Sequence, residues 1–424
     1  MESIGFFMQK MQRPEVLIIG GGIVGVSCAA QLARNGAQVT LLEKNTIGSG
    51  CSYGNAGWMT PCFAMPLPLP GMMLKSFKWL LNPEGPLYIK PQPSLDLFYW
   101  LYTFLKSMNQ KQAEKAIKGL VELSLLSLNE YKALNEKYPQ AFNFEQKGLL
   151  MVGQTEEGVQ SAVDEMNLVS SHNVPGKKLS ADEVRIMEPA LTGPLSGGVY
   201  FPNEAHAEPL KTVQTIAQEA KNFGATLLEN IQVLGFTKNG PHIESVQTTQ
   251  GDFKSSTYVL ATGSWSKSLT QELRLRVPIL GGKGYSLIVP KIKPNPTYPI
   301  MLVEKKIAIT PRENNLRIAG TLELVDQDFS ITQRRVQAIV KGAREFLNVP
   351  QNLEIQELWQ GLRPCTPDGL PLIGFHHQIQ NLMLACGHQM LGLQSGIGTG
   401  VMVSDLIQGR QPLVGAELFN PNRF

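Results

Sequence analysis

The chain has 424 residues, of which 43% are hydrophobic and 17% charged, and its formal net charge is +3. These values indicate a globular protein of two or three domains or one large interleaved body, and the scattered lysines and arginines exclude a nucleic-acid footprint. The five cysteines include no C-x-x-C pair, which favours free thiols over a disulfide framework, and the six histidines have no metal-ligand spacing, so no metal is expected.

The first predicted elements lie in an apolar run, Val16–Ala33. Strand Val16–Ile19 leads through a glycine cluster into helix Val26–Arg34, and a second strand, Gln38–Leu42, follows. The run has 18 residues, near the lower limit for a membrane span. Its glycines and short helix favour a parallel strand that is buried on both faces.

The glycine cluster is a G-x-G-x-x-G pattern formed by Gly20, Gly22 and Gly25. Gly20 permits the tight turn, Gly22 lets the backbone approach a pyrophosphate, and Gly25 allows close helix–strand packing. The pyrophosphate would lie at the helix N-terminus. Glu43 follows Gly20 by 23 residues, where a carboxylate accepts ribose hydroxyls. The pattern predicts dinucleotide binding; the alternative is a glycine-rich turn without a ligand.

A mainly helical region follows a polar loop (45–57) and a proline-rich stretch (61–70). Helices are predicted at Met72–Leu81, Leu95–Met108, Ala113–Tyr138, Glu156–His172 and Ser180–Glu188, and strands within Phe142–Val152. Ser180 and Glu183 have the spacing of a capping box, which predicts where the last of these helices begins.

The second half of the chain mixes both kinds of element. Strands are predicted at Gly197–Pro202, Ala225–Leu228, Ile231–Thr237, Ser245–Thr249, Asp252–Lys254 and Tyr258–Gly263, and helices at Pro209–Phe223 and Thr332–Leu347. A period of two predicts an antiparallel sheet from Gly284–Val289, Met301–Glu304, Ile307–Thr310 and Leu316–Ala319. A strand, a glycine-rich turn and a helix are predicted within Leu382–Leu406.

The fold class is therefore α/β, with mixed α+β character. We expect a Rossmann-like dinucleotide-binding domain assembled from residues 14–60, 200–275 and 355–424. The interleaved substrate domain, built on the antiparallel sheet, comprises residues 61–199 and 276–354. Sites in such architectures usually lie between the domains.

Several motifs together resemble one family. They are the initial glycine motif, SYGNAG, ATGSW, KGYSL, GLRPCTPDGLPLIG and CGHQMLGLQSGIGTG, and they extend over about residues 15–409. The chain resembles the FAD-dependent amine and amino-acid oxidoreductases, the superfamily of D-amino acid oxidase, glycine oxidase and sarcosine oxidase. Within it, the pattern is most similar to the bacterial D-amino acid dehydrogenases.

The resemblance implies FAD as the cofactor and a set of residues around it. The implied FAD-binding residues are Gly20, Gly22, Ile23, Val24, Gly25, Glu43, Lys44, Ser49, Cys51, Ser52, Asn55, Ala56, Gly57, Val233, Ala261, Thr262, Gly263, Trp265, Gly361, Arg363, Gly387, His388, Gln389, Leu391, Gly392 and Leu393. Some sarcosine oxidases bind flavin through a cysteine near the Thr-Pro-Asp motif. Cys365 lies closer to Thr366 than that cysteine does, so non-covalent FAD is expected.

The resemblance also implies the chemistry, which is hydride transfer from Cα to flavin N5. A D-amino acid gives an imino acid, then a 2-oxo acid and ammonia. Arg363, in GLRP, would hold the substrate carboxylate in a fork. Tyr285 would add a phenol hydrogen bond, Gln389 would bind near the flavin or the amine, and His206 is a lone histidine that relatives place near the flavin. For Arg363 the alternative is a structural salt bridge at a domain junction, and for Tyr285 and His206 it is a purely structural role.

The wall His388–Gln394 departs from the usual dehydrogenase pattern, so the preferred amino acid stays open. The alternatives are a glycine or sarcosine oxidase type, a D-hydroxyproline dehydrogenase type, a hydrogen-cyanide synthase subunit, an NAD-dependent dehydrogenase, or a non-catalytic flavin-binding subunit of a larger complex. The resemblance favours transfer of the electrons to a quinone or another respiratory partner, and the residues alone leave the choice between such a partner and O2 open.

The helix predicted at Leu95–Met108 is unusually aromatic. It is interpreted as an aromatic core helix. The alternative is a patch in contact with a membrane surface, formed by Trp79, Phe98, Tyr99, Trp100 and Tyr102 with Lys75, Lys78 and Lys106. A cytoplasmic location is expected, with peripheral contact on the inner face of the cytoplasmic membrane as the alternative. The sequence gives no oligomeric state.

Overall fold

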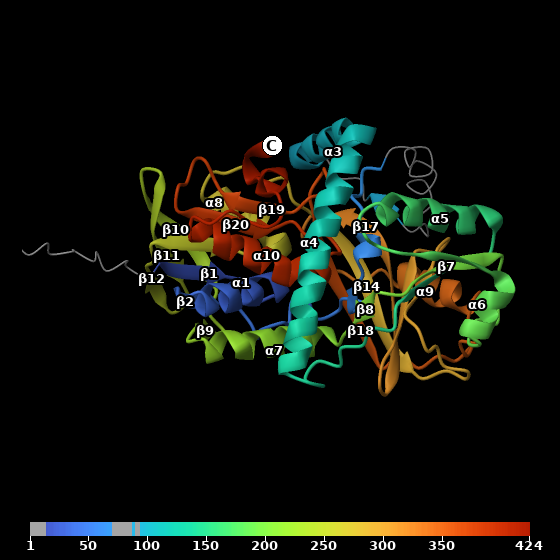
Figure 1. Ribbon diagram of the computed structural model, residues 1–424. Coiled ribbons are helices and arrows are strands. Elements are labelled where there is room, and N and C mark those ends of the chain that lie inside the picture. The colour runs from blue at the N-terminus through green and yellow to red at the C-terminus, as the bar shows by residue number, and fades with distance from the viewer. Residues whose placement is uncertain (1–13, 70–86, 90–93) are drawn as a thin grey trace, which may run out of the picture.

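The computed structural model describes residues 14–69, 87–89 and 94–424. A parallel sheet with its covering helices forms the left side of Figure 1, and a larger, mainly antiparallel sheet forms the right side. Helix α4 (Gln110–Lys137) crosses the front of the molecule between them, and the C-terminus lies at the top, near α3 (Leu95–Ser107).

The left-hand sheet has six strands in the order β19-β20-β13-β1-β2-β9, all parallel except β19. They are β1 (Glu15–Ile19), β2 (Gln38–Leu42), β9 (Thr226–Leu228), β13 (Thr257–Leu260), β19 (Leu372–Phe375) and β20 (Leu382–Cys386). Val16 and Ile18 of β1 belong to one apolar core, and Leu17 and Ile19 to another. Because successive strand residues point to opposite faces, both faces of β1 are buried, and the prediction of a buried strand is confirmed.

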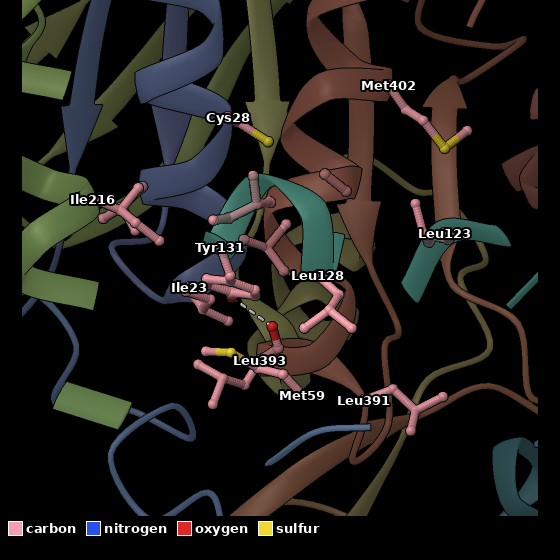
Figure 2. Close-up of a cluster of buried hydrophobic side chains, with 14 of the residues drawn as sticks. Ile23, Cys28, Met59, Leu123, Leu128, Tyr131, Ile216, Leu391, Leu393 and Met402 are labelled. Carbon is pink, nitrogen blue, oxygen red and sulfur yellow. Dashed lines mark hydrogen bonds between the residues drawn. The ribbon is translucent and has the colours of Figure 1, made fainter. Parts of the chain in front are cut away.

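One face of this sheet is covered by helices from distant parts of the chain. They are α1 (Ile23–Arg34), α7 (Pro209–Asn222) and α10 (Gly392–Ile407), with α4 packed against α10. Helices α4 and α10 can approach closely because Gly398 has no side chain. A Cβ there would lie only 2.8 Å from the carbonyl oxygen of Leu123. In Figure 2, Tyr131 of α4 points at the start of α10, where its hydroxyl donates to the carbonyl of Leu393 at 2.6 Å.

The other face of the parallel sheet carries a small antiparallel sheet. Its strands are β10 (Val233–Asn239), β11 (His242–Thr248) and β12 (Gly251–Phe253), and short helix α8 (Ser266–Glu272) lies beside β10. Val246 of β11 is buried in the same core as Leu17 and Tyr258 of the parallel sheet. The strands predicted at Ser245–Thr249 and Asp252–Lys254 are confirmed as β11 and β12, which pair antiparallel, and β10 is the third strand.

The right-hand sheet has nine strands in the order β18-β14-β17-β16-β15-β5-β7-β6, with β4 beside β17. They are β4 (Leu87–Ile89), β5 (Leu149–Gly153), β6 (Lys177–Ser180), β7 (Gly197–Phe201), β14 (Leu280–Pro290), β15 (Ile300–Leu302), β16 (Ile307–Pro311), β17 (Asn315–Val325) and β18 (Glu357–Cys365). The predicted antiparallel sheet is confirmed, because β14, β17, β16 and β15 pair antiparallel in that order. The whole sheet is mixed, because β15 pairs with β5, and β17 with β4, in parallel.

Helices α5 (Glu156–Ser170), α6 (Ala181–Met187) and α9 (Gln333–Arg344) pack on this sheet, and β3 (Trp58–Met59) pairs with β8 (Ala205–His206). The 3-10 turns are η1 (Pro61–Phe63), η2 (Gly263–Trp265), η3 (Ala416–Phe419) and η4 (Pro421–Arg423). The predicted capping box is present: Glu183 N–H donates to the Ser180 hydroxyl at 3.2 Å, and Ser180 N–H to the Glu183 carboxylate at 2.8 Å. None of the described helices is both long and apolar enough to span a membrane.

Three predictions about the fold were not confirmed. The helix expected at Met72–Leu81 lies outside the described residues. In Phe142–Val152 the structure has a strand from Leu149 only, with one isolated bridge at Glu145 before it. The division into two domains stays a prediction, and two elements cross it. Strand β18, assigned to the dinucleotide domain, pairs with β14 in the nine-stranded sheet, and α4, assigned to the substrate domain, packs on α10.

Candidate active site

A cavity of about 980 Å³ extends from the carboxyl ends of the parallel strands to the face of the nine-stranded sheet. Ile19, Leu42 and Ala261 contribute to its wall at one side, and residues of β14, β16, β17 and β18 at the other. The cavity thus lies where ligands bind in open α/β sheets, outside the carboxyl ends of the strands.

Glycines shape the part of the cavity beside the start of α1. Gly20 has φ +108°, and a Cβ there would lie 2.6 Å from the carbonyl oxygen of Ala261, whereas a Cβ at Gly25 would collide with the carbonyl oxygen of Gly20. Gly22 is the N-cap of α1 and provides no side-chain cap. In the first turn, Ile23 N–H donates to the Ser52 hydroxyl at 3.0 Å. The start of α1 therefore offers N–H groups and a positive dipole end to an anion.

Glu43 has the predicted place after β2, and its carboxylate also braces the glycine turn. It accepts from Gly21 N–H at 2.7 Å and from Asn45 N–H at 2.9 Å. The next residue, Lys44, places its ammonium 3.8 Å from the ring centroid of Trp265, and Val233 also lines the cavity. A carboxylate with free lone pairs beside an aromatic wall suits a ribose and an adenine.

The polar loop after β2 is attached to the nine-stranded sheet. Arg317, buried on β17, donates from Nη1 to the carbonyl oxygens of Tyr53, at 3.1 Å, and Asn55. Thr310 donates to the carbonyl of Ala56 at 2.8 Å, and the Cys51 thiol donates to the carbonyl of Leu362 at 2.8 Å. These bonds hold the loop between the glycine turn and the sheet.

Most predicted site residues meet at this cavity. Its lining includes Gly20, Gly22, Ile23, Val24, Glu43, Lys44, Ser49, Cys51, Ser52, Asn55, Ala56, Val233, Ala261, Thr262, Gly263, Trp265, Tyr285, Gly361, Arg363, His388, Gln389, Leu391, Gly392 and Leu393. Three predicted glycines are not in the lining. Gly25 packs against Gly20, while Gly57 and Gly387 have φ of +87° and +82° and allow turns beside it.

Arg363 lies over the floor of the cavity. Its guanidinium occupies the space where a Cβ of Gly284 would be, and Nη1 donates to the carbonyl oxygen of Thr321 at 2.8 Å. Burial lowers the pKa of Arg363 below its usual range. Within the described residues no carboxylate forms an ion pair with it. A desolvated guanidinium without a counter-ion attracts a planar anion such as a carboxylate.

Tyr285 contributes to the cavity wall, but its hydroxyl does not face Arg363. Since adjacent strand residues point to opposite faces, Tyr285 points away from the side on which Gly284 meets the guanidinium. Its hydroxyl accepts from Thr332 N–H at 3.0 Å and lies 3.5 Å from the Glu323 carboxylate. The geometry favours the alternative of a packed structural tyrosine.

His206 is not among the residues that line the cavity. It lies buried in β8, where its Nε2 is 3.5 Å from the Glu145 carboxylate. Burial lowers the pKa of His206 to about 4. This placement also favours the structural alternative over a catalytic role.

His388 and Gln389 lie in the turn before α10. Burial lowers the pKa of His388 to about 3, and its Nε2 is 2.9 Å from the Thr399 hydroxyl, so the ring is neutral and held in place. Gln389 has φ +51°, and its buried Nε2 has no hydrogen-bond partner. A buried amide donor without a partner at a cavity wall indicates a ligand acceptor opposite it.

Trp359 is a wall residue that the sequence analysis missed. Its ring fills the space where Cβ atoms of Gly54 and Gly361 would be, and it lies on the same face of β18 as Gly361 and Arg363. These three residues alternate along the strand, and this spacing of two in the sequence could have identified Trp359 as a neighbour of Arg363. Lys306 and Glu165 also line the cavity and were not singled out. Among the described residues, no group of three or more His, Cys, Asp or Glu side chains could hold a metal ion.

The residues present fit FAD. A glycine cradle at a helix N-terminus suits the pyrophosphate, the Glu43 carboxylate suits the ribose, and the unpartnered Gln389 amide suits a polar edge of the flavin.

Comparisons with known proteins agree with this geometry. The chain is 30% identical to the D-amino acid dehydrogenase of Vibrio atlanticus (strain LGP32), with 93% of this chain and 96% of that protein covered. It is 29% identical to the D-amino acid dehydrogenase of Granulibacter bethesdensis (strain ATCC BAA-1260 / CGDNIH1), covering 94% and 96%.

Two solved structures share the fold. Glycine oxidase from Geobacillus kaustophilus superposes with a TM-score of 0.78 at 22% identity, covering 98% of this chain and 100% of that one. L-proline dehydrogenase from P. horikoshii gives a TM-score of 0.78 at 23% identity, covering 97% and 98%. The family model described as DAO, FAD dependent oxidoreductase, matches residues 15–406. The chain therefore belongs to the DAO family of FAD-dependent oxidoreductases.

Proposed function

We propose that this protein is an FAD-dependent D-amino acid dehydrogenase. The observation that carries the proposal is Arg363, a half-buried guanidinium on the cavity wall that has no ion pair with a described carboxylate. A cation so placed binds the α-carboxylate that every amino acid carries. The relatives named above support the D-configuration of the substrate and a dehydrogenase rather than an oxidase.

Each of the wall residues has a distinct task in this proposal. Arg363 holds the substrate carboxylate with two parallel hydrogen bonds and so fixes the direction of the Cα–H bond. Gln389 donates from its unpartnered Nε2 to the ligand beside it. Bound FAD supplies the acceptor for the hydride of Cα.

The substrate amine must lose a proton before the hydride leaves. His388 is a poor base because its pKa is about 3 and its ring already bonds Thr399. His206 lies outside the cavity lining. We therefore assign the proton to solvent, with no side chain as an obligatory general base.

An exposed apolar face on α3 supports transfer of the electrons to a membrane-bound acceptor such as a quinone. Leu95, Phe98, Tyr102 and Leu105 are 87%, 72%, 60% and 53% exposed and recur at helical spacing. Trp100, on the other side of α3, is buried and lines the cavity. A single helix thus connects the cavity wall to a face suited to a lipid surface.

The proposal is tested by anaerobic bleaching of the flavin absorption band. Purified protein is mixed with D- and L-amino acids, glycine, sarcosine and proline derivatives. We expect bleaching by D-amino acids, little bleaching by the L-enantiomers, and slow recovery in air compared with an added quinone. Bleaching by glycine or sarcosine alone would point to an oxidase-type substrate, and a yellow protein that no amine bleaches would contradict the proposal.

A further inference from the structure

The cavity wall contains an ion pair that was not among the predicted site residues. Lys306 Nζ lies 3.1 Å from the Glu165 Oε1, and both side chains line the cavity with 30% and 20% of their surface exposed. Lys306 belongs to the turn between β15 and β16, and Glu165 to α5. An ion pair on a cavity wall offers hydrogen-bond donors and acceptors to a ligand.

Strand register places this pair beside Arg363. Ala308 of β16 pairs with Ala319, which pairs with Ser286, which pairs with Trp359 of β18, so one row crosses the cavity floor. Lys306 lies in the turn just before β16, two residues before Ala308, and Gly284 lies on β14, two residues before Ser286. Both residues line the same cavity.

The guanidinium of Arg363 lies over Gly284, and its Nη1 reaches Thr321 of β17. Lys306 directly precedes Ile307, which pairs with Gly320, and its carbonyl oxygen lies 3.5 Å from where a Cβ of Gly320 would be, so Lys306 lies beside the Gly320–Thr321 segment. Strands β14 and β16 lie on either side of β17, two inter-strand spacings or about 10 Å apart. This separation suits an amino acid with its carboxylate on Arg363 and its side chain extended toward Lys306.

The charges of the pair limit which side chain fits. Lys306 and Glu165 together carry no net charge, so a charged side chain would bring an uncompensated charge into the pocket. A purely apolar side chain would remove water from both ions without replacing its hydrogen bonds. A hydroxyl or carboxamide both donates and accepts, while Phe63, Met301 and Ala308 on the same wall pack against the aliphatic part of the ligand.

We propose that the Lys306–Glu165 pair forms the side-chain end of the substrate pocket and selects amino acids with polar, uncharged side chains. This inference rests on the proposed function. For the wild-type protein we expect kcat/KM for D-asparagine to exceed that for the near-isosteric D-leucine at least tenfold. A preference for D-leucine would overturn the inference.

Two variants that change the charge of the pocket in opposite directions give the sharper test. Glu165→Gln leaves Lys306 unpaired, so the ratio of kcat/KM for D-glutamate to that for D-lysine should rise at least tenfold. Lys306→Met leaves Glu165 unpaired, so the same ratio should fall at least tenfold. Titration of the visible flavin band with 2-oxo acids, which bind without being oxidised, should show the same opposite changes in dissociation constant.

Lys305→Met is the matched control. Lys305 lies in the same turn, pairs with Glu345 at 2.6 Å, and is not part of the cavity lining. Lys305→Met changes the net charge of the protein as much as Lys306→Met does. Because Lys305 does not line the cavity, the ratio should stay within twofold of the wild type.

The outcomes separate this inference from the proposed function. If D-alanine bleaches the flavin but neither variant moves the ratio beyond the control, the inference fails and the function stands. If no D-amino acid bleaches the flavin, the function fails and the inference fails with it. If Lys306→Met is recovered unfolded or without flavin, the kcat/KM ratio measured for Glu165→Gln decides whether the inference stands.

Discussion

The guanidinium of Arg363 fills the space in which a side chain at Gly284 would begin. The two residues lie on adjacent antiparallel strands, where Gly284 pairs with Gly361 and Arg363 with Gly282. The missing side chain at Gly284 is therefore what lets the cation lie flat on the cavity floor and reach Thr321.

The Gly284→Ala variant should displace the guanidinium, because the added methyl group and Arg363 cannot share this space. We expect KM for the D-amino acid to rise by about tenfold, equivalent to ~1.4 kcal/mol of lost binding, with FAD still bound. Steady-state kinetics and the flavin spectrum measure both. Unchanged KM would show that substrate binding does not depend on the position of the guanidinium.

The Arg363→Lys variant keeps the positive charge but loses the planar fork that holds both carboxylate oxygens. Hydrogen bonds to charged groups contribute about 1.5–3 kcal/mol, so KM should rise between about 10-fold and 100-fold. The amount of bound flavin per chain should match that of the wild type. Kinetics indistinguishable from the wild type would remove Arg363 from the substrate site.

Arg317 holds the loop that faces the cofactor, through the carbonyl oxygens of Tyr53 and Asn55. Arg317→Met removes both hydrogen bonds, so we expect the dissociation constant of FAD to rise about tenfold, consistent with the ~1.5–3 kcal/mol of such bonds. Quenching of free flavin fluorescence measures it. Arg312→Met is the control, because Arg312 contacts the same acid as Arg317, Glu208, but none of the loop carbonyls above. Equal weakening in both variants would assign the effect to Glu208 instead of the loop.

Glu204 is 1% exposed, and its Oε2 has no hydrogen-bond partner. Burial raises its pKa from 4.5 to about 8, so the folded protein holds a proton that the unfolded chain releases near pH 4.5. The stability of the wild type should therefore fall as the pH rises from about 4.5 to 8, by at most about 1.4 kcal/mol for each pH unit.

Glu204→Gln removes this ionisation and keeps an oxygen to accept from Cys62 N–H. Its melting temperature should exceed that of the wild type at pH 9, and the difference should shrink at pH 5. The exposed substitution Glu354→Gln serves as the reference. A gain of the same size at both pH values would contradict a neutral Glu204 in the folded state.

The exposed face of α3 should mediate binding to lipid. Replacing Phe98 and Tyr102 by serine should reduce co-sedimentation with anionic vesicles several-fold, since the apolar area that enters the interface is lost. Ile186 and Leu413 are 81% and 82% exposed elsewhere and provide the matched serine double variant. Trp100 is unsuitable for this test because its indole is buried and donates to the carbonyl of Cys365 at 3.0 Å. Equal sedimentation of both double variants would exclude α3 as the contact.

The sequence by itself determined the features that depend on neighbouring residues. The turn at Gly20 and Gly25, the acid at Glu43 and the capping box at Ser180 follow local rules of backbone conformation and hydrogen bonding, and each has its predicted place. The DAO-family relationship was also visible, because its motifs are contiguous runs of residues.

Only the tertiary structure decided what depends on strand register and on packing between distant segments. A single step along β14 separates Gly284, under the guanidinium, from Tyr285, which faces the opposite core, because adjacent strand residues point to opposite faces. His206 is excluded from the cavity by the pairing of β8 with β3. Lys306 and Glu165 are 141 residues apart and become wall residues of one pocket through the fold alone, so no local pattern could have identified them.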